Sequence, residues 1–111
     1  MALIADQLGC AEQLARFFPN LPAVRLAVRV TPRRPGAAKL LQESAMIEFG
    51  SADYAIFLTA LPLEFDDRVR LERDGKGRPV EAAVIALQYH EGRKAVAVRF
   101  LDGPWDWMMQ P

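Results

Sequence analysis

The chain has 111 residues, of which 51% are hydrophobic and 25% are charged, a composition typical of one globular domain. Its 14 Lys and Arg residues balance its 14 Asp and Glu residues, so a net charge of zero excludes a global attraction to DNA or to a membrane surface. Any site for an anion must therefore be local. We predict a single domain over residues 1–111.

The single cysteine, Cys10, excludes an intramolecular disulfide and fits a reducing compartment. Residues 1–18 contain Asp6 and Glu12 and lack the unbroken apolar core of a signal peptide. No segment approaches the roughly 18 consecutive apolar residues that a membrane span needs. These features predict a soluble cytoplasmic protein without a membrane span.

The first predicted element is an amphipathic helix over residues 2–18, because apolar residues recur there at helical spacing. Pro19 and Pro22 end this segment. From Ala23 the period changes to two, and valines and Leu26 alternate with Arg25, Ala27, Arg29 and Thr31, which predicts a half-buried strand. The segment from Ala37 to Ser44 is ambiguous between a helical turn and the start of a strand.

The rest of the chain predicts a series of strands separated by turns. The predicted strands span residues 45–49, 54–59, 68–73, 80–90 and 94–101. Turn signals separate the last three strands, Asp74-Gly75-Lys76-Gly77 before the fourth and Glu91-Gly92 before the fifth. Short strands at this spacing predict a mostly β fold, a small antiparallel β-barrel with a short N-terminal helix. Residues 23–101 would form the barrel and residues 102–111 an apolar tail.

The sequence offers few candidates for a catalytic site. The only histidine, His90, has no neighbouring cysteine or second histidine, so a metal site is not expected. Neither a nucleophile elbow nor a phosphate-binding loop occurs. The adjacent pair Asp66-Asp67 indicates a turn, since neighbours in an extended chain point to opposite faces. We therefore expect a non-catalytic binding domain without a cofactor.

One pattern runs through residues 24–101. The stretch from Met46 to Leu71 contains a Leu61-Pro62-Leu63 loop followed by Asp66-Asp67-Arg68-Val69, and the later hairpin ends with Val98-Arg99-Phe100. This pattern resembles the PilZ family, a bacterial family of barrels that bind the signalling dinucleotide cyclic di-GMP. The resemblance implies a PilZ-like barrel that acts as a cyclic di-GMP receptor.

Two ligand motifs of that family have counterparts here. Arg29 and Arg33 match the Arg-x-x-x-Arg motif by spacing, and Arg34 is adjacent. The second motif, Asp/Asn-x-Ser-x-x-Gly, aligns with the segment from Glu48 to Asp53, in which Gly50 takes the serine position, Ser51 follows one place late and Asp53 takes the glycine position. The resemblance implies that the arginines bind phosphate and stack on guanine, while Glu48, Gly50, Ser51 and Asp53 line the base.

The altered second motif weakens this prediction. A carboxylate at position 53 would repel a ligand phosphate, although aspartate tolerates a left-handed turn better than most residues. The alternative is a degenerate PilZ-like adaptor that binds another protein, with Trp105, Trp107, Met108 and Met109 as an interface or, as is the usual fate of clustered aromatics, as a cover for the barrel. The arginine cluster is also compatible with a solvated strand. A nucleic-acid-binding barrel fits less well, because the net charge is zero and no aromatics alternate with the arginines. A homodimer is left open.

Overall fold

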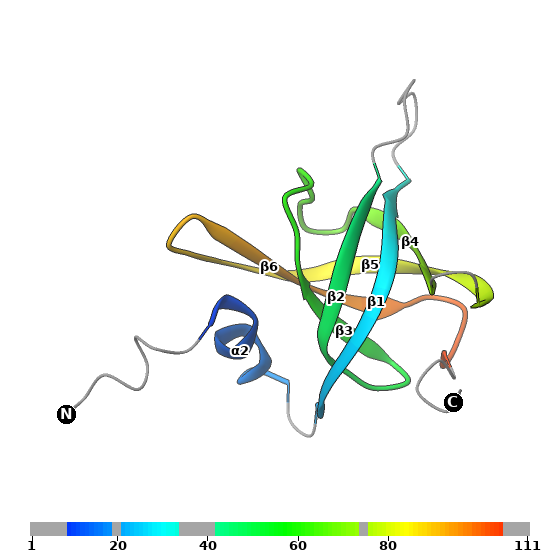
Figure 1. Ribbon diagram of the computed structural model, residues 1–111, viewed down its shortest axis with the longest axis horizontal. Helices are drawn as coiled ribbons and strands as arrows, with labels where there is room; N and C mark the ends of the chain where they lie inside the picture. The colour runs from blue at the N-terminus through cyan, green and yellow to red at the C-terminus, as the bar shows by residue number, and fades with distance from the viewer. Residues whose placement is uncertain (1–8, 19–20, 34–41, 74–75, 106–111) are drawn as a thin grey trace.

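The computed structural model describes residues 9–18, 21–33, 42–73 and 76–105 (Figure 1). Six antiparallel strands form a closed barrel in the order β1-β2-β3-β6-β5-β4, which confirms the predicted fold class. One short helix, α2 (Cys10–Ala15), precedes them. The strands are β1 (Ala23–Pro32), β2 (Glu43–Gly50), β3 (Tyr54–Leu58), β4 (Arg68–Arg73), β5 (Lys76–His90) and β6 (Arg93–Phe100).

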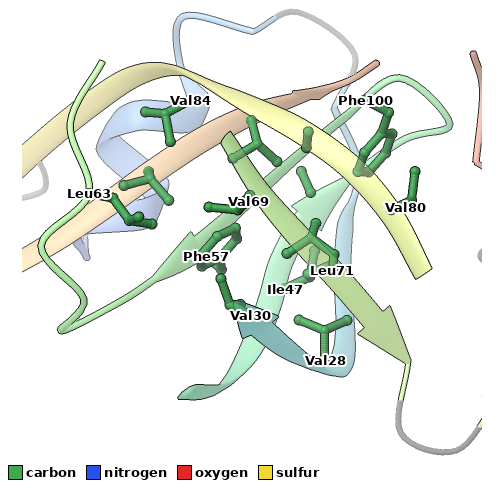
Figure 2. Packing of buried hydrophobic residues seen from close by; sticks show 14 of the residues in the cluster. Val28, Val30, Ile47, Phe57, Leu63, Val69, Leu71, Val80, Val84 and Phe100 are labelled. Atoms are coloured by element: carbon green, nitrogen blue, oxygen red, sulfur yellow. The ribbon is translucent and has the colours of Figure 1, made fainter. Parts of the chain in front are cut away.

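The inward positions of every strand fill the barrel with apolar side chains (Figure 2). Alternate residues of a strand point to opposite faces, so a valine or leucine at every second position produces one apolar inner surface. Val69 and Leu71 are fully buried on β4, as is Phe57 on β3. The residues between them lie on the outside. Truncating such a fully buried side chain as Phe57 to alanine would cost about 3–5 kcal/mol.

The predicted strands agree with the observed ones within a few residues, except for β5. This strand begins at Lys76 and not at Val80, because Arg73 pairs with Lys76 across Asp74 and Gly75, two residues that lie outside the described ranges. The turn at Glu91 and Gly92 is confirmed, with positive φ angles of 52° and 79°. Asp66 also has a positive φ of 72°, and the Asp67 carboxylate accepts a hydrogen bond from the Glu64 amide at 2.9 Å, so this acidic pair forms a turn as expected.

Helix α2 covers the outer face of β3, β6 and β5. Its buried residues Cys10, Ala11 and Leu14 pack against Ile56, Ala95 and Ala97 in a second apolar cluster outside the barrel. The Cys10 thiol donates to the carbonyl of Gln88 at 2.9 Å and so links the helix to β5. Of the predicted helix over residues 2–18, residues 2–8 lie outside the described ranges. No helix in the described part of the chain has the length and apolarity to cross a membrane.

The start of the C-terminal tail packs on the barrel. Trp105 is buried, its ring stands edge-on to Phe100 with 5.4 Å between centroids, and its amide donates to Ala52 at 2.9 Å. This residue therefore covers the barrel and does not offer an exposed interface anchor. Trp107, Met108 and Met109 lie outside the described residues.

The pH dependence of the free energy of unfolding should show whether α2 is packed on the barrel with the Cys10 thiol buried. Burial is the main cause that raises the pKa of the Cys10 thiol above its ordinary value of 9.0. The unfolded chain therefore ionises first, so the stabilisation is present below about pH 9 and is lost as the pH rises through the raised pKa. Cys10→Ser keeps a hydroxyl donor for Gln88 but does not titrate.

We expect the free energy of unfolding, measured in urea between about pH 7 and pH 10.5, to fall more steeply in the wild type than in C10S. All other titrating groups are common to the two proteins. Parallel curves would contradict a buried thiol at this position.

Candidate ligand-binding site

The structure separates the two halves of the predicted cyclic di-GMP site. Ala23 pairs with Phe49 beside the Glu48–Asp53 turn, whereas Arg29 pairs with Ser44, six residues or about 20 Å further along the extended strand. Arg33 lies beyond the far end of β1, where its amide donates to the Arg68 carbonyl at 2.8 Å. The expectation that Arg29 and Arg33 converge on this turn is therefore wrong. Arg34 lies outside the described residues.

The backbone of the Glu48–Asp53 turn is used within the fold. The Gly50 amide donates to Pro22, the Ala52 carbonyl accepts from Trp105, and the Asp53 carbonyl accepts from Phe100, each at about 3 Å. These bonds join the turn to the start of β1, to the end of β6 and to the C-terminal segment. Such bonding is what buried backbone groups require in any fold.

The Ser51 hydroxyl also has a structural role. Its oxygen accepts from the amides of Asp53 at 3.2 Å and Tyr54 at 3.3 Å, which is the local bonding of a serine in a turn. The Asp53 side chain is exposed, and Asp53 does not have the left-handed conformation expected of a glycine replacement, since the described non-glycine residues with positive φ are Asp66 and Glu91. Glu48 is half-buried beside α2 and close enough to raise the pKa of Cys10.

Arginine side chains instead gather on the outer surface of β1, β4 and β6. Because Val69, Leu71, Val98 and Phe100 point into the barrel, the arginines between them point outward. We call this surface the arginine face and define it by Arg29, Arg33, Arg68, Arg70, Arg99, Glu72 and Glu81. Five arginines against two glutamates give it a net charge of +3 in a chain whose total charge is zero.

Strand register places three of these arginines in one row across the barrel. Arg33 lies beside Arg68, Arg68 pairs with Ala83, and Ala83 pairs with Arg99. Neighbouring strands lie about 4.8 Å apart, so the backbones of Arg68 and Arg99 are about 10 Å apart with the small Ala83 side chain between them. Two long, exposed arginine side chains therefore lie on either side of the small, buried side chain of Ala83.

The acidic side chains of the arginine face neutralise this row only at Arg33. Glu81 is shared, with one oxygen 3.6 Å from Arg33 Nε and the other 3.3 Å from Arg70 Nε. Arg29, Arg68 and Arg99 have no ion pair with any residue that the structure describes. Like charges that face each other on adjacent strands destabilise a sheet, so an anion bound at the row would relieve repulsion.

Sequence reasoning identified Arg29 and Arg33 but missed Arg68, Arg70 and Arg99. The alternation of Val69 and Leu71 with arginines was a signal that these arginines point outward. Which of these arginines lie near one another, and which lies beside Arg33, depends on strand register, which the local pattern does not contain.

An open groove beside the β5–β6 hairpin has three of its polar side chains, Glu43, Thr59 and Lys94, engaged within the fold. It lies between the ends of β2 and β3 and the tip of the β5–β6 hairpin, where the Glu43 carboxylate accepts from the Thr59 hydroxyl and the Ala60 amide. The Lys94 ammonium donates to the carbonyls of Leu61 and Leu63. The side chains of Glu43 and Lys94 at this groove therefore serve the fold.

Among the described residues, no group of three or more His, Cys, Asp or Glu side chains could hold a metal ion. No family model matches the chain, and no curated protein matches it. The function must therefore be argued from the site itself.

The structural role of Ser51 can be tested by Ser51→Ala. Two amides lose their acceptor, which should lower the free energy of unfolding by about 1–2 kcal/mol. Ser44→Ala is the matched control, since Ser44 is exposed on β2 and its hydroxyl has no bond to the described residues. Chemical denaturation measures both. A normal stability for S51A would contradict the structural assignment.

Proposed function

We propose that this domain is a non-catalytic PilZ-like module that binds an anionic ligand on the arginine face, with cyclic di-GMP as the leading candidate. The observation that carries the proposal is the row of Arg33, Arg68 and Arg99 around Ala83, in which Arg68 and Arg99 lack ion pairs with the described residues. The resemblance of residues 24–101 to the PilZ family supplies the ligand class.

Guanidinium chemistry suits such a ligand. A guanidinium group can bind a phosphate with two parallel hydrogen bonds and can stack on the flat face of a base. Cyclic di-GMP has two phosphates and two guanines, so a row of arginines can engage both features. Ala83 is 5% exposed, so a phosphate or a base would contact the guanidinium groups of Arg68 and Arg99 above it.

This proposal moves the ligand away from the Glu48–Asp53 turn. The ligand would lie around Ala83, between Arg68 and Arg99, while Asp53 borders the β6 end of the arginine face, since the Phe100 amide donates to the Asp53 carbonyl and Tyr54 pairs with Arg99. Arg29 and Arg33 keep a role in the site, while the turn residues keep their role in the fold.

The second candidate is a PilZ-like adaptor that binds an acidic protein surface. The exposure of Arg29, Arg33, Arg68 and Arg99 on the outside of a barrel favours it, because a convex basic surface can dock on a complementary acidic one. Trp105 does not contribute to this alternative, since it is buried against Phe100.

Calorimetric titration with cyclic di-GMP tests the first candidate. Arg68→Ala and Arg99→Ala should each weaken binding about 10- to 100-fold, since each loses charge-assisted hydrogen bonds worth about 1.5–3 kcal/mol. Arg16→Ala is the control, because Arg16 is exposed at the end of α2 and away from the arginine face. Affinity in S51A should equal that of the wild type.

The outcomes separate the candidates. Binding that is lost in R68A and R99A but retained in R16A supports the dinucleotide. Binding that depends on Ser51 and Asp53 but not on Arg68 would return the site to the turn and overturn the proposal. Absence of heat in the folded wild type at hundreds of micromolar ligand would remove cyclic di-GMP and leave the adaptor.

A further inference from the structure

Strand β5 is much longer than the strand that pairs with its outer edge. It continues to His90, whereas its pairing with β4 ends at Arg68 and Ala83. Asp66 and Asp67 add one further pair of bonds to Val84, and the chain then turns away through Glu64. Beyond Val84, one edge of β5 has no neighbouring strand in the described part of the chain. Figure 1 shows this region as the hairpin that extends from the barrel.

The backbone of this edge points away from the barrel's own strands. The Lys94 carbonyl accepts from Thr59 on the β3 side, so the pair Tyr89–Lys94 is the type that exchanges no hydrogen bonds. Tyr89 and, by alternation, Leu87 therefore direct their amides and carbonyls to the free edge. The described residues provide a single bond to these groups, a long one of 3.4 Å from the Gln88 side chain to the Tyr89 carbonyl.

This edge lacks the features that usually prevent strand addition. Natural edges are protected by lysines, prolines or bulges that turn the edge away. Residues 85–89 read Ile-Ala-Leu-Gln-Tyr, without a charge or a proline. A bulge lies between Val84 and Ala86, where the overhanging part begins, and the pairing with β6 is regular beyond it from Ala86 to His90. Helix α2 packs on the outer face of the hairpin, against Ala95 and Ala97 of β6 and against Ile85 and Ala86 of β5, and the Gln13 side chain accepts from the Gln88 side chain.

Two exposed aromatic side chains stand at opposite ends of the free edge. Tyr89 is 67% exposed near the hairpin tip, and Phe65 is 68% exposed beside the Val84 end, where the Asp66 amide bonds to the Val84 carbonyl. An antiparallel copy of the same edge, centred on Leu87, would place Tyr89 opposite Ile85 of the second copy. Tyr89 would then lie beside Phe65 of that copy. Aromatic pairs across strands add about 0.2–1 kcal/mol each.

Charge supports the same arrangement. The hairpin tip carries two basic residues, Arg93 and Lys94, beside one exposed acid, Glu91, and the turn at the other end of the edge carries exposed Glu64 and Asp66. Antiparallel pairing of two copies brings the basic tip of each toward the acidic turn of the other. The net charge of zero adds no repulsion between copies.

We propose that two copies of this chain associate through the free edge of β5, with Leu87 on the two-fold axis and with Tyr89 of each copy against Phe65 of the other. The pairing extends each barrel sheet into a continuous sheet across the dimer and satisfies the free amides of Leu87 and Tyr89. It uses neither the arginine face nor the Glu48–Asp53 turn, so it is independent of the proposed ligand.

Sedimentation equilibrium over a concentration series tests the dimer. Tyr89→Lys and Phe65→Lys should each raise the dimer dissociation constant about tenfold or more, because each puts an ammonium group into the aromatic contact. Phe17→Lys is the matched control, since Phe17 is 73% exposed at the end of α2 and away from the edge. Circular dichroism melts verify that each variant folds, and the two test positions lie on separate elements.

Amide hydrogen exchange supplies a second readout. In the wild type, the amides of Leu87 and Tyr89 should exchange more slowly at high protein concentration, while the amide of Gln88, which faces β6, should not change. A wild type that stays monomeric up to about millimolar concentration would overturn the proposal. A dimer that forms equally well in Y89K and F65K would also overturn it, since its interface would lie elsewhere.

Discussion

The pairing of β1 with β4 is the constraint on which the rest of the structure depends. These strands are separated by two others in sequence, and their antiparallel pairing closes the sheet. Closure forces every inward position into one shared interior, which the side chains of Phe57, Ile47 and Leu71 fill (Figure 2). Closure also brings Arg33 beside Arg68. The core and the arginine face are therefore two consequences of the same pairing.

The strands could be predicted from the sequence because each one carries its own alternation. Val69 and Leu71 between arginines identify β4 without knowledge of its neighbours, and Glu91-Gly92 identifies a turn from its local chemistry. The start of β5 could not be found in the same way. On their own, Gly77 and Pro79 indicate a turn. The pairing of Lys76 with Arg73 overrides that local preference.

The site was harder to predict for a physical reason. A local pattern tells which face of a strand a side chain occupies, but it does not tell which distant residue lies opposite. Arg68 and Arg99 are far apart in sequence and meet across Ala83 only through two registers. The Glu48–Asp53 turn presents the opposite difficulty, because here the local pattern indicates a ligand site. Its serine and glycine have the composition of a ligand loop, yet their groups bond to Tyr54 and Pro22, because a turn joining three parts of a barrel must satisfy its own backbone.

A barrel of this size leaves its interior no room for a ligand, since the side chains that close it also fill it. Recognition must then use the outside, and the outside divides into regions of different chemistry. Small residues such as Ala95 and Ala97 allow α2 to pack closely on β6, and arginines cover β4 and the far half of β1. The overhang of β5 has α2 on one face, whereas its free edge belongs to neither region. Because its unpaired amides arise from a difference in strand length and not from any side chain, its association would be preserved by substitutions that change the arginine face, and the two surfaces can vary separately.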